Sequence, residues 1–200
     1  GAYPEDVIAD LRAEGALPAG PLPFLQPGDL EQISAPTDLL GVNYYSRGVV
    51  RSDRLPEADN LPRTVPAPGP EQLTDFGWEI HPPTLTRLLL RLTRDYRPAA
   101  LYITENGAAY NTAPGPDGRV PDERRVAYLE GHLDAAAEAV ALGAPLRGYF
   151  AWSLLDNFEW AEGFHQRFGL VWVDFETKQR LPKESFHWYR RRIAASALTP

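Results

Sequence analysis

The chain has 200 residues, of which 44% are hydrophobic and 24% charged, as is usual for a globular domain with its own core. Its net charge of −7 argues against a nucleic-acid partner, because phosphate binding needs a basic patch and the only basic run, residues 190–192, falls near the end of a predicted surface helix. The lack of cysteine excludes disulfides, thiolate catalysis and cysteine-ligated metal sites.

The apolar runs and the first residues of the chain indicate where in the cell the protein is expected. No run approaches the roughly 20 apolar residues that span a bilayer, so no membrane partner is expected. No signal peptide is visible, which favours the cytoplasm. The chain begins at Gly1 and contains no methionine, and its first 15 residues resemble an interior segment. We therefore expect a piece of a longer protein.

The first part of the chain predicts one helix and one strand. Two acids in residues 4–6 suit the positive end of a short helix, which Gly15 can close. Residues 16–37 are rich in Pro and Gly and predict a loop. Residues 39–44 are mostly apolar and indicate a buried strand. Residues 46–76, with five prolines, predict a long loop of the kind that is often functional.

Two longer helices follow, separated by a strand at residues 101–103. The first begins at Pro82, and its leucines recur at helical spacing, which marks a buried face: Leu85, Leu88, Leu89 and Leu92. The second is expected over residues 121–142, with Gly143 as its stop. Its buried stripe is predicted at Val126, Leu129, Leu133, Ala136 and Val140.

The last part predicts a third buried strand at residues 148–152 and a polar and aromatic loop at 153–167. Residues 170–174 indicate one strand of a small hairpin that turns near 177–178. Pro182 opens a final helix to about Ala195.

This alternation predicts parallel βα units and an α/β fold. Three strands cannot close a barrel, and a (β/α)8 TIM barrel usually needs about 250 residues or more. We expect residues 1–200 to supply roughly three of the eight βα units of one such barrel.

All three predicted strands end in polar or aromatic clusters, namely residues 43–45, 104–107 and 152–160. In a barrel these ends share the face that carries the active site. Flat apolar rings can pack on the C–H faces of a sugar, and the chain offers them in Tyr45, Trp78, Trp152, Trp160 and Phe168. Retaining glycoside hydrolysis needs two carboxyl groups about 5–5.5 Å apart, so a carboxylate at a strand end suits this chemistry.

Two of these clusters lie in recognisable motifs. Ile103-Thr104-Glu105-Asn106-Gly107 resembles the nucleophile motif of family 1 glycoside hydrolases, the β-glucosidase and β-galactosidase family. Residues 148–160 resemble the motif of that family's last barrel strand. Both occur in order after Gly41-Val42-Asn43-Tyr44-Tyr45, and the likeness runs from Tyr3 to about Tyr189. It implies the C-terminal portion of a retaining β-glucosidase barrel.

The resemblance implies a role for each residue at the reacting centre. Glu105 would be the nucleophile that forms a covalent glycosyl-enzyme. Tyr45 would donate a hydrogen bond to it and favour its charged form. Asn43 would help to order the same site. The chemistry implied needs no metal and no cofactor, and the scattered histidines show no metal-ligand spacing: His81, His132, His165 and His187.

The resemblance also implies a sugar-binding set. Glu159 would bind the outer hydroxyls of the sugar with Trp160 beside it. Trp152 would form the stacking floor, Phe168 the wall, and Trp78 would face the leaving group.

One departure concerns the substrate. Relatives that cleave 6-phosphorylated sugars carry Ser, Lys and Tyr where this chain has Glu159, Gln166 and Phe168. A carboxylate at 159 would repel a phosphate, so an unphosphorylated β-glucoside is expected, with galactosides or fucosides as further candidates.

The family's acid/base glutamate belongs to a Thr-x-Asn-Glu-Pro motif that does not occur in these 200 residues. The missing N-terminal half of the barrel is therefore an expected partner, and the chain alone is expected to be inactive.

Three alternatives remain open: a thioglucosidase or transglycosylase of the same family, a truncated chain that at most binds sugar weakly, and purely structural roles for Glu105, Glu159 or the aromatic residues. Asp156 and Asn157 are expected to brace their loop rather than react.

Overall fold

A computed structural model describes residues 2–48, 69 and 72–196. Most of the long loop expected at 46–76 thus lies outside the described residues. The chain divides into two compact units, residues 1–38 and 39–200, and each is described by itself. Within the described ranges, no helix has the length and apolar character needed to cross a membrane.

The first unit contains two short helices. Helix α1 (Glu5–Ala13) carries Glu5 and Asp6 in its first turn, and Gly15 follows it with a left-handed φ of 76°, as expected. Helix α2 (Asp29–Ile33) corrects the prediction of an uninterrupted loop over 16–37. The Asp29 carboxylate accepts a hydrogen bond from the Gln26 backbone amide at 2.8 Å. So short and polar a helix has no apolar period to reveal it.

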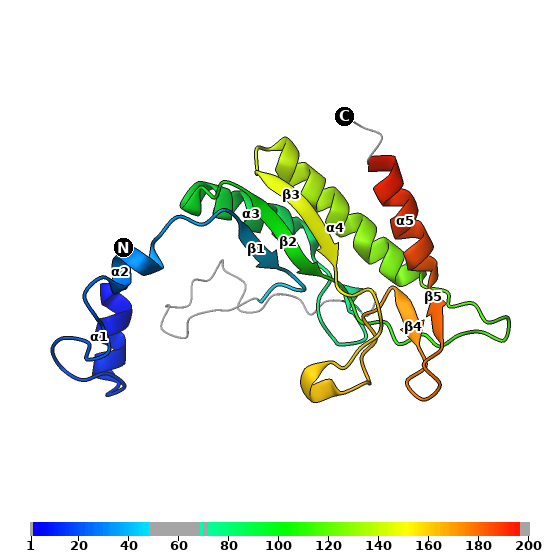
Figure 1. Cartoon of the computed structure of the whole chain (residues 1–200), viewed down its shortest axis with the longest axis horizontal. Helices are drawn as coiled ribbons and strands as arrows, with labels where there is room; N and C mark the ends of the chain where they lie inside the picture. The colour runs from blue at the N-terminus through cyan, green and yellow to red at the C-terminus, as the bar shows by residue number, and fades with distance from the viewer. Residues whose placement is uncertain (1, 49–68, 70–71, 197–200) are drawn as a thin grey trace, which may run out of the picture. The chain divides into compact units, whose positions relative to one another are not determined.

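The second unit is built on a three-stranded parallel sheet (Figure 1). Strands β1 (Leu40–Asn43), β2 (Leu101–Asn106) and β3 (Leu146–Ala151) lie in the order β1-β2-β3. Helix α3 (Pro82–Tyr96) joins the first pair and helix α4 (Glu123–Ala141) the second. The parallel βα units are therefore confirmed.

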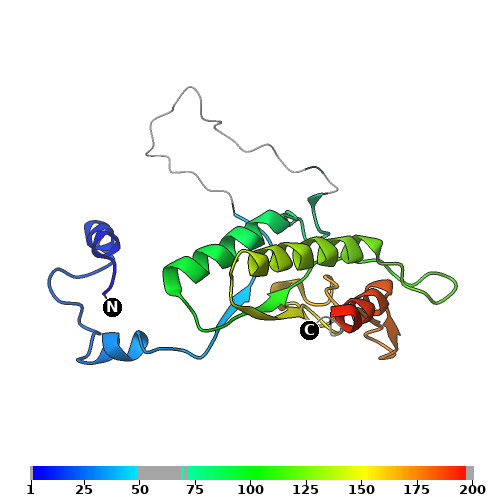
Figure 2. The ribbon, with the colours of Figure 1, turned by 90° about the horizontal axis from the view of Figure 1, so that it is seen from above.

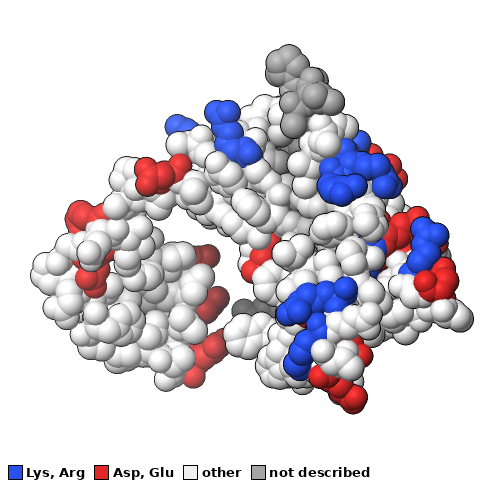
Figure 3. Space-filling model, turned by 45° about the vertical axis from the view of Figure 1, so that its right-hand side comes forward, with Lys and Arg blue, Asp and Glu red and all other residues white. Residues whose placement is uncertain are grey.

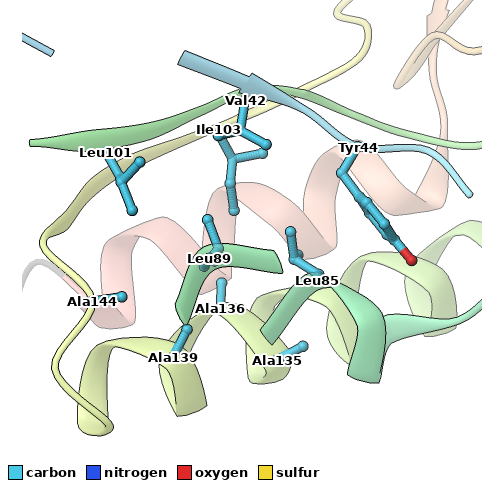
Figure 4. Close-up of a cluster of buried hydrophobic side chains, with 10 residues drawn as sticks. All are labelled: Val42, Tyr44, Leu85, Leu89, Leu101, Ile103, Ala135, Ala136, Ala139 and Ala144. Carbon is cyan, nitrogen blue, oxygen red and sulfur yellow. The ribbon is translucent and has the colours of Figure 1, made fainter. Parts of the chain in front are cut away.

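Both helices cover the same face of the sheet, side by side (Figure 2). Strand residues such as Val42 and Ile103 point toward them, and Leu85 and Leu89 of α3 fill the space between (Figure 4). Helix α4 contributes only small side chains to this core, which let it approach the sheet and α3 closely: Ala135, Ala136 and Ala139. Leu85, Leu89, Leu101 and Ile103 are completely buried.

The predicted stripe on α4 is wrong in part. Leu129 and Ala136 are buried, but Val140 is 47% exposed. The helix instead buries a neighbouring stripe: Arg125, Tyr128, Leu129, His132, Ala135, Ala136 and Ala139. Hydrophobicity alone predicts the wrong face of the helix, because Arg125 and His132 are polar and would be expected at the surface. Both are buried because each has a hydrogen-bond partner inside the fold.

The rest of the unit follows β3. The 3-10 helix η2 (Trp160–Glu162) interrupts the expected loop. Strands β4 (Val171–Val173) and β5 (Arg180–Pro182) form the predicted antiparallel hairpin, whose turn contains Lys178 at a φ of 66°. Helix α5 (Glu184–Ser196) begins slightly later than predicted and packs against α4.

Surface charge is mixed. Figure 3 shows Lys and Arg in separate groups, with Asp and Glu beside them on the face in view.

The core position of Leu89 gives a stability test. Leu89→Ala should lower the free energy of unfolding by about 2–5 kcal/mol, because a completely buried leucine leaves a cavity. Val140→Ala is the control, since that side chain is exposed, and its effect should stay within about 0.5 kcal/mol. Denaturant unfolding of both variants measures the difference, and equal effects would contradict the described α4 stripe.

Candidate active site

Glu105 lies near the carboxyl end of β2, beside the residues that follow β1. The Tyr45 hydroxyl donates a hydrogen bond to Glu105 Oε2 at 2.6 Å. The backbone amide of Tyr44 donates to the Glu105 carbonyl at 2.9 Å. Two strand ends are thereby joined at the carboxylate, which is half-buried.

The environment keeps Tyr45 protonated. Burial raises the pKa of its hydroxyl far above the usual value, and the hydrogen bond to Glu105 and the charges of Glu105 and Glu159 raise it further. Tyr45 is therefore a permanent donor to the Glu105 carboxylate. The Glu159 charge acts on the same hydroxyl, so that side chain belongs to the same electrostatic environment.

Asn43 ends β1 and lies beside Thr104, the residue before Glu105 in β2. Its Oδ1 accepts a hydrogen bond from the Thr104 hydroxyl at 2.7 Å, and both side chains are exposed. Side chains alternate along a strand. Val42 and Ile103 face the helices, so Asn43 and Thr104 lie on the opposite face of the sheet.

Aromatic rings gather around Tyr45. Trp78 and Phe168 pack edge-on against it, with ring centroids 5.3 and 6.0 Å away. Phe76 adds a fourth ring, 4.3 Å from Trp78. Phe76 was not predicted as a site residue. The run Phe76-Gly77-Trp78 is the signal for it, because a glycine between two aromatic residues favours a turn that brings their rings together, and Gly77 has a φ of 82°.

The remaining predicted residues lie on the loop after β3. Trp152 is half-buried, and its amide donates to the Asn106 carbonyl at 2.9 Å. Glu159 is half-buried as well, while Trp160 is 84% exposed. The structure thus brings Glu105, Tyr45, Trp78 and Phe168 together but leaves Trp160 open to solvent.

Beneath the site, the Asn106 side chain ties the strand ends together. It is completely buried. Its Nδ2 donates to the Tyr44 carbonyl at 2.6 Å and to the Tyr128 hydroxyl at 3.0 Å, and its Oδ1 accepts from the Tyr149 hydroxyl. This one amide connects β1, β2, β3 and α4 next to Glu105.

A buried arginine holds the surrounding loops. The Arg125 guanidinium pairs with Asp122 at 2.7 Å, and it donates to the carbonyls of Ala108 and Phe168. Burial raises the pKa of the Asp122 carboxyl, while the charge of Arg125 and a hydrogen bond from Ser185 lower it. The burial of this arginine was not predicted, because a charged residue in a helix is usually exposed to solvent.

Asp156 braces the loop after β3, as expected. Its carboxylate pairs with Lys183 at 3.0 Å and Arg167 at 2.7 Å, and it accepts from the Gly169 amide at 2.9 Å. Burial is the main cause that lowers the pKa of Lys183 to about 8. Asn157 donates to the Ser153 hydroxyl at 2.9 Å, which also fits a bracing role.

Glycine is required directly after the motif's asparagine. A Cβ at Gly107 would overlap the carbonyl oxygen of Trp152. Only a glycine lets the chain from β2 pass this close to the end of β3.

Metal ligation finds no support in the part of the chain that the structure describes. Within residues 2–48, 69 and 72–196, no group of three or more His, Asp or Glu side chains is placed to hold an ion.

The sequence profile of glycosyl hydrolase family 1 matches residues 1–197. The chain belongs to this family. It is 41% identical to beta-glucosidase A of Thermotoga maritima over 198 residues, which cover 99% of this chain and 42% of that protein. It is 43% identical over 184 residues to a bifunctional beta-D-glucosidase/beta-D-fucosidase of Bifidobacterium breve, covering 86% of this chain and 40% of that protein.

The fold agrees with the same family. A solved beta-glucosidase from Thermotoga maritima, in complex with castanospermine, superposes with a TM-score of 0.79 at 40% identity, covering 97% of this chain and 41% of that chain. The expected partial (β/α)8 barrel is thereby confirmed. The chain spans about two-fifths of the length of these relatives.

Because Arg125 is buried and Arg124 is not, replacing these two neighbours should lower the stability of the fold by very different amounts. Arg125→Met should destabilise the fold by about 3–5 kcal/mol, because Asp122 and several carbonyls lose their partner. Arg124→Met removes an ion pair to Asp75 whose arginine side chain is 56% exposed, and should cost about 1 kcal/mol or less. Thermal and denaturant unfolding of both variants checks this, and a similar loss in each would contradict the structural role of Arg125.

His132 predicts a pH-dependent stability. Burial lowers its pKa from 6.5 to about 4 in the folded chain. Between these values the unfolded chain binds more protons, so stability present above pH 6.5 is lost as pH falls toward 4. The loss should reach about 3 kcal/mol.

Carboxylates titrate in the same range, so the measurement compares the free energy of unfolding of wild type and His132→Phe from pH 4 to 8. The wild-type curve should fall more steeply toward pH 4. Parallel curves would show that His132 contributes nothing to the slope.

Proposed function

We propose that this chain supplies the nucleophile and part of the sugar pocket of a retaining β-glucosidase that hydrolyses unphosphorylated, terminal β-D-glucosides. The hydrogen bond of 2.6 Å from Tyr45 to Glu105, at the carboxyl end of a barrel strand, is the observation that carries the proposal. The names of the relatives from Thermotoga maritima and Bifidobacterium breve support the same substrate class.

The reaction would proceed in two displacements. With Oε2 held by Tyr45, Glu105 Oε1 attacks the anomeric carbon while the bond from that carbon to the leaving oxygen breaks, and an acid protonates the leaving oxygen. Water then attacks the same carbon, its proton passes to the group that acted as acid, and the bond to Glu105 breaks. The hydrogen bond from Tyr45 favours the charged nucleophile and stabilises the carboxylate that leaves in the second step.

The surrounding residues would recognise the sugar. Trp152 offers a flat surface for one face of the pyranose, Phe168 closes the wall, and Trp78 lies toward the leaving group. Glu159, with Trp160 beside it, would accept hydrogen bonds from outer hydroxyls and repel a phosphorylated sugar. Asn43 would help to order the same site, with its Oδ1 accepting the hydrogen bond from Thr104 next to Glu105.

The proton donor would come from outside this chain. These 200 residues contain no Thr-x-Asn-Glu-Pro motif and span about 42% of the Thermotoga maritima relative. We place the acid/base glutamate and the other hydroxyl-binding residues on an N-terminal barrel portion, which would be the partner of this chain.

An apolar surface between β3 and α5 supports such a partner. It holds a cavity of about 460 Å³, lined in part by Phe150, Leu154, Tyr189 and Ile193. Phe150, Leu154 and Ile193 are each more than half exposed. Closing the sheet with further barrel elements would cover this surface.

The first test separates the chain from the complete barrel. The isolated 200 residues should show negligible turnover of an aryl β-glucoside, because the leaving group has no proton donor. The complete polypeptide should be active, and a 2-fluoro-glucoside should label it at Glu105, as measured by mass spectrometry of the proteolysed protein. Turnover by the isolated chain comparable to that of a relative would contradict the proposal.

Matched variants sharpen this test. In the complete protein, Glu105→Gln should lower kcat by at least about 10³-fold and abolish labelling, because the nucleophile is lost. Glu130→Gln, which changes an exposed carboxylate on α4, should leave both unchanged. Labelling at another residue would overturn the site. Labelling with a thioglucoside as the preferred substrate would favour a thioglucosidase.

A further inference from the structure

The Tyr128 hydroxyl bonds to residues on either side of the proposed nucleophile, Asn106 and Tyr45, although the reaction does not use it. It accepts a hydrogen bond from Asn106 Nδ2 at 3.0 Å and donates to the Tyr45 carbonyl at 3.3 Å. Asn106 follows Glu105 in β2, and Tyr45 supplies the hydrogen bond to Glu105. The same hydroxyl therefore contacts both residues that determine where the carboxylate and its donor lie.

Tyr128 is itself held in place by His132, one turn later on α4. The two rings stack with centroids 4.0 Å apart and an angle of 30° between their planes. His132 Nδ1 lies 2.8 Å from the Tyr128 carbonyl, a distance at which the ring N–H donates to that oxygen. Both residues are almost completely buried, so neither ring has room to turn.

The His132 ring has one further property. Its Nε2 is buried and has no hydrogen-bond partner among the described residues. A buried acceptor without a partner costs stability, which purely structural packing would avoid by placing an apolar ring there. Burial lowers the pKa of His132 to about 4 and raises the pKa of Tyr128 above its usual value. At neutral pH both rings are therefore uncharged, and Tyr128 keeps the proton that it donates to Tyr45.

We propose that Tyr128, stacked on His132, is a positioning residue that fixes the hydrogen bond between Tyr45 and Glu105 from beneath the active site. The proposal rests on the proposed function, because it assigns a task to Tyr128 only if Glu105 reacts. Without the hydroxyl, the Tyr45 backbone loses one tie to the sheet and Asn106 loses one of its acceptors. The donor would then shift relative to the carboxylate, and misplacement by about 1 Å can cost about 100-fold in rate.

The test uses Tyr128→Phe in the complete protein, which removes one oxygen and keeps the ring stacked on His132. We expect kcat to fall about tenfold or more while KM changes little, because positioning acts on the transition state. Loss of stability alone would lower the melting temperature without lowering kcat of the folded enzyme.

Tyr110→Phe is the matched control. Tyr110 is 2% exposed and belongs to the same buried cluster as Tyr128, but it lies outside the hydrogen bonds that join Asn106 and Tyr45. Its loss of a hydroxyl should leave kcat unchanged. If both variants slow the reaction equally, the effect is one of general packing and the proposal is wrong.

A double-mutant cycle tests the route of the effect. Tyr45→Phe removes the donor itself. If Tyr128 acts through Tyr45, the double variant should be about as slow as Tyr45→Phe alone. Multiplied losses would show that Tyr128 acts by another path and would overturn the proposal.

Two further measurements keep the outcome decisive. If Tyr128→Phe does not fold, His132→Phe keeps a flat ring, loses no partner at Nε2 and should lower kcat by a smaller factor; an unchanged kcat then overturns the proposal. A crystal structure of the folded variant should show the distance from Tyr45 Oη to Glu105 Oε2 lengthened from 2.6 Å; an unchanged distance also overturns it. An inactive wild type, or labelling elsewhere than Glu105, would instead refute the proposed function.

Discussion

The arrangement of this chain depends on the buried side-chain amide of Asn106. Parallel strands are held along their length by backbone hydrogen bonds, but their ends diverge where loops begin. Asn106 uses its amide to hold Tyr44 after β1, Tyr149 on β3 and Tyr128 on α4. Every donor and acceptor of the Asn106 amide is paired, so burying it costs little stability and makes the network rigid. The position of the neighbouring Glu105 carboxylate is fixed by this network.

The sequence predicted the elements well where apolar periodicity was strong, as in α3 with Leu85 and Leu89. It also gave Glu105 and Tyr45 as neighbours, because a family motif carried that information. It failed where a polar residue belongs inside, as on α4, where Arg125 and His132 replace the predicted Val140. Their partners are backbone carbonyls from distant loops, and no local pattern encodes such contacts.

Beneath the loops, where the apolar core ends, buried charges and hydrogen bonds stabilise the structure. Arg125 gathers the carbonyls of the strand-end loops, and Asp156 gathers two cations and two backbone amides. Irregular backbone needs such partners because it cannot pair with itself as helices and strands do. Buried ion pairs and hydrogen bonds thus hold the loops of the proposed site in place. The helix layer is instead held by packed aliphatic side chains.

The close passage at Gly107 limits how this chain can be altered in the laboratory. Saturation libraries that randomise the residues around Glu105 would return only glycine at 107, because any side chain there meets the Trp152 carbonyl. The Trp160 side chain, by contrast, is 84% exposed. Within the proposed sugar-binding set, Trp160 is therefore a position at which substitutions should disturb the described fold little.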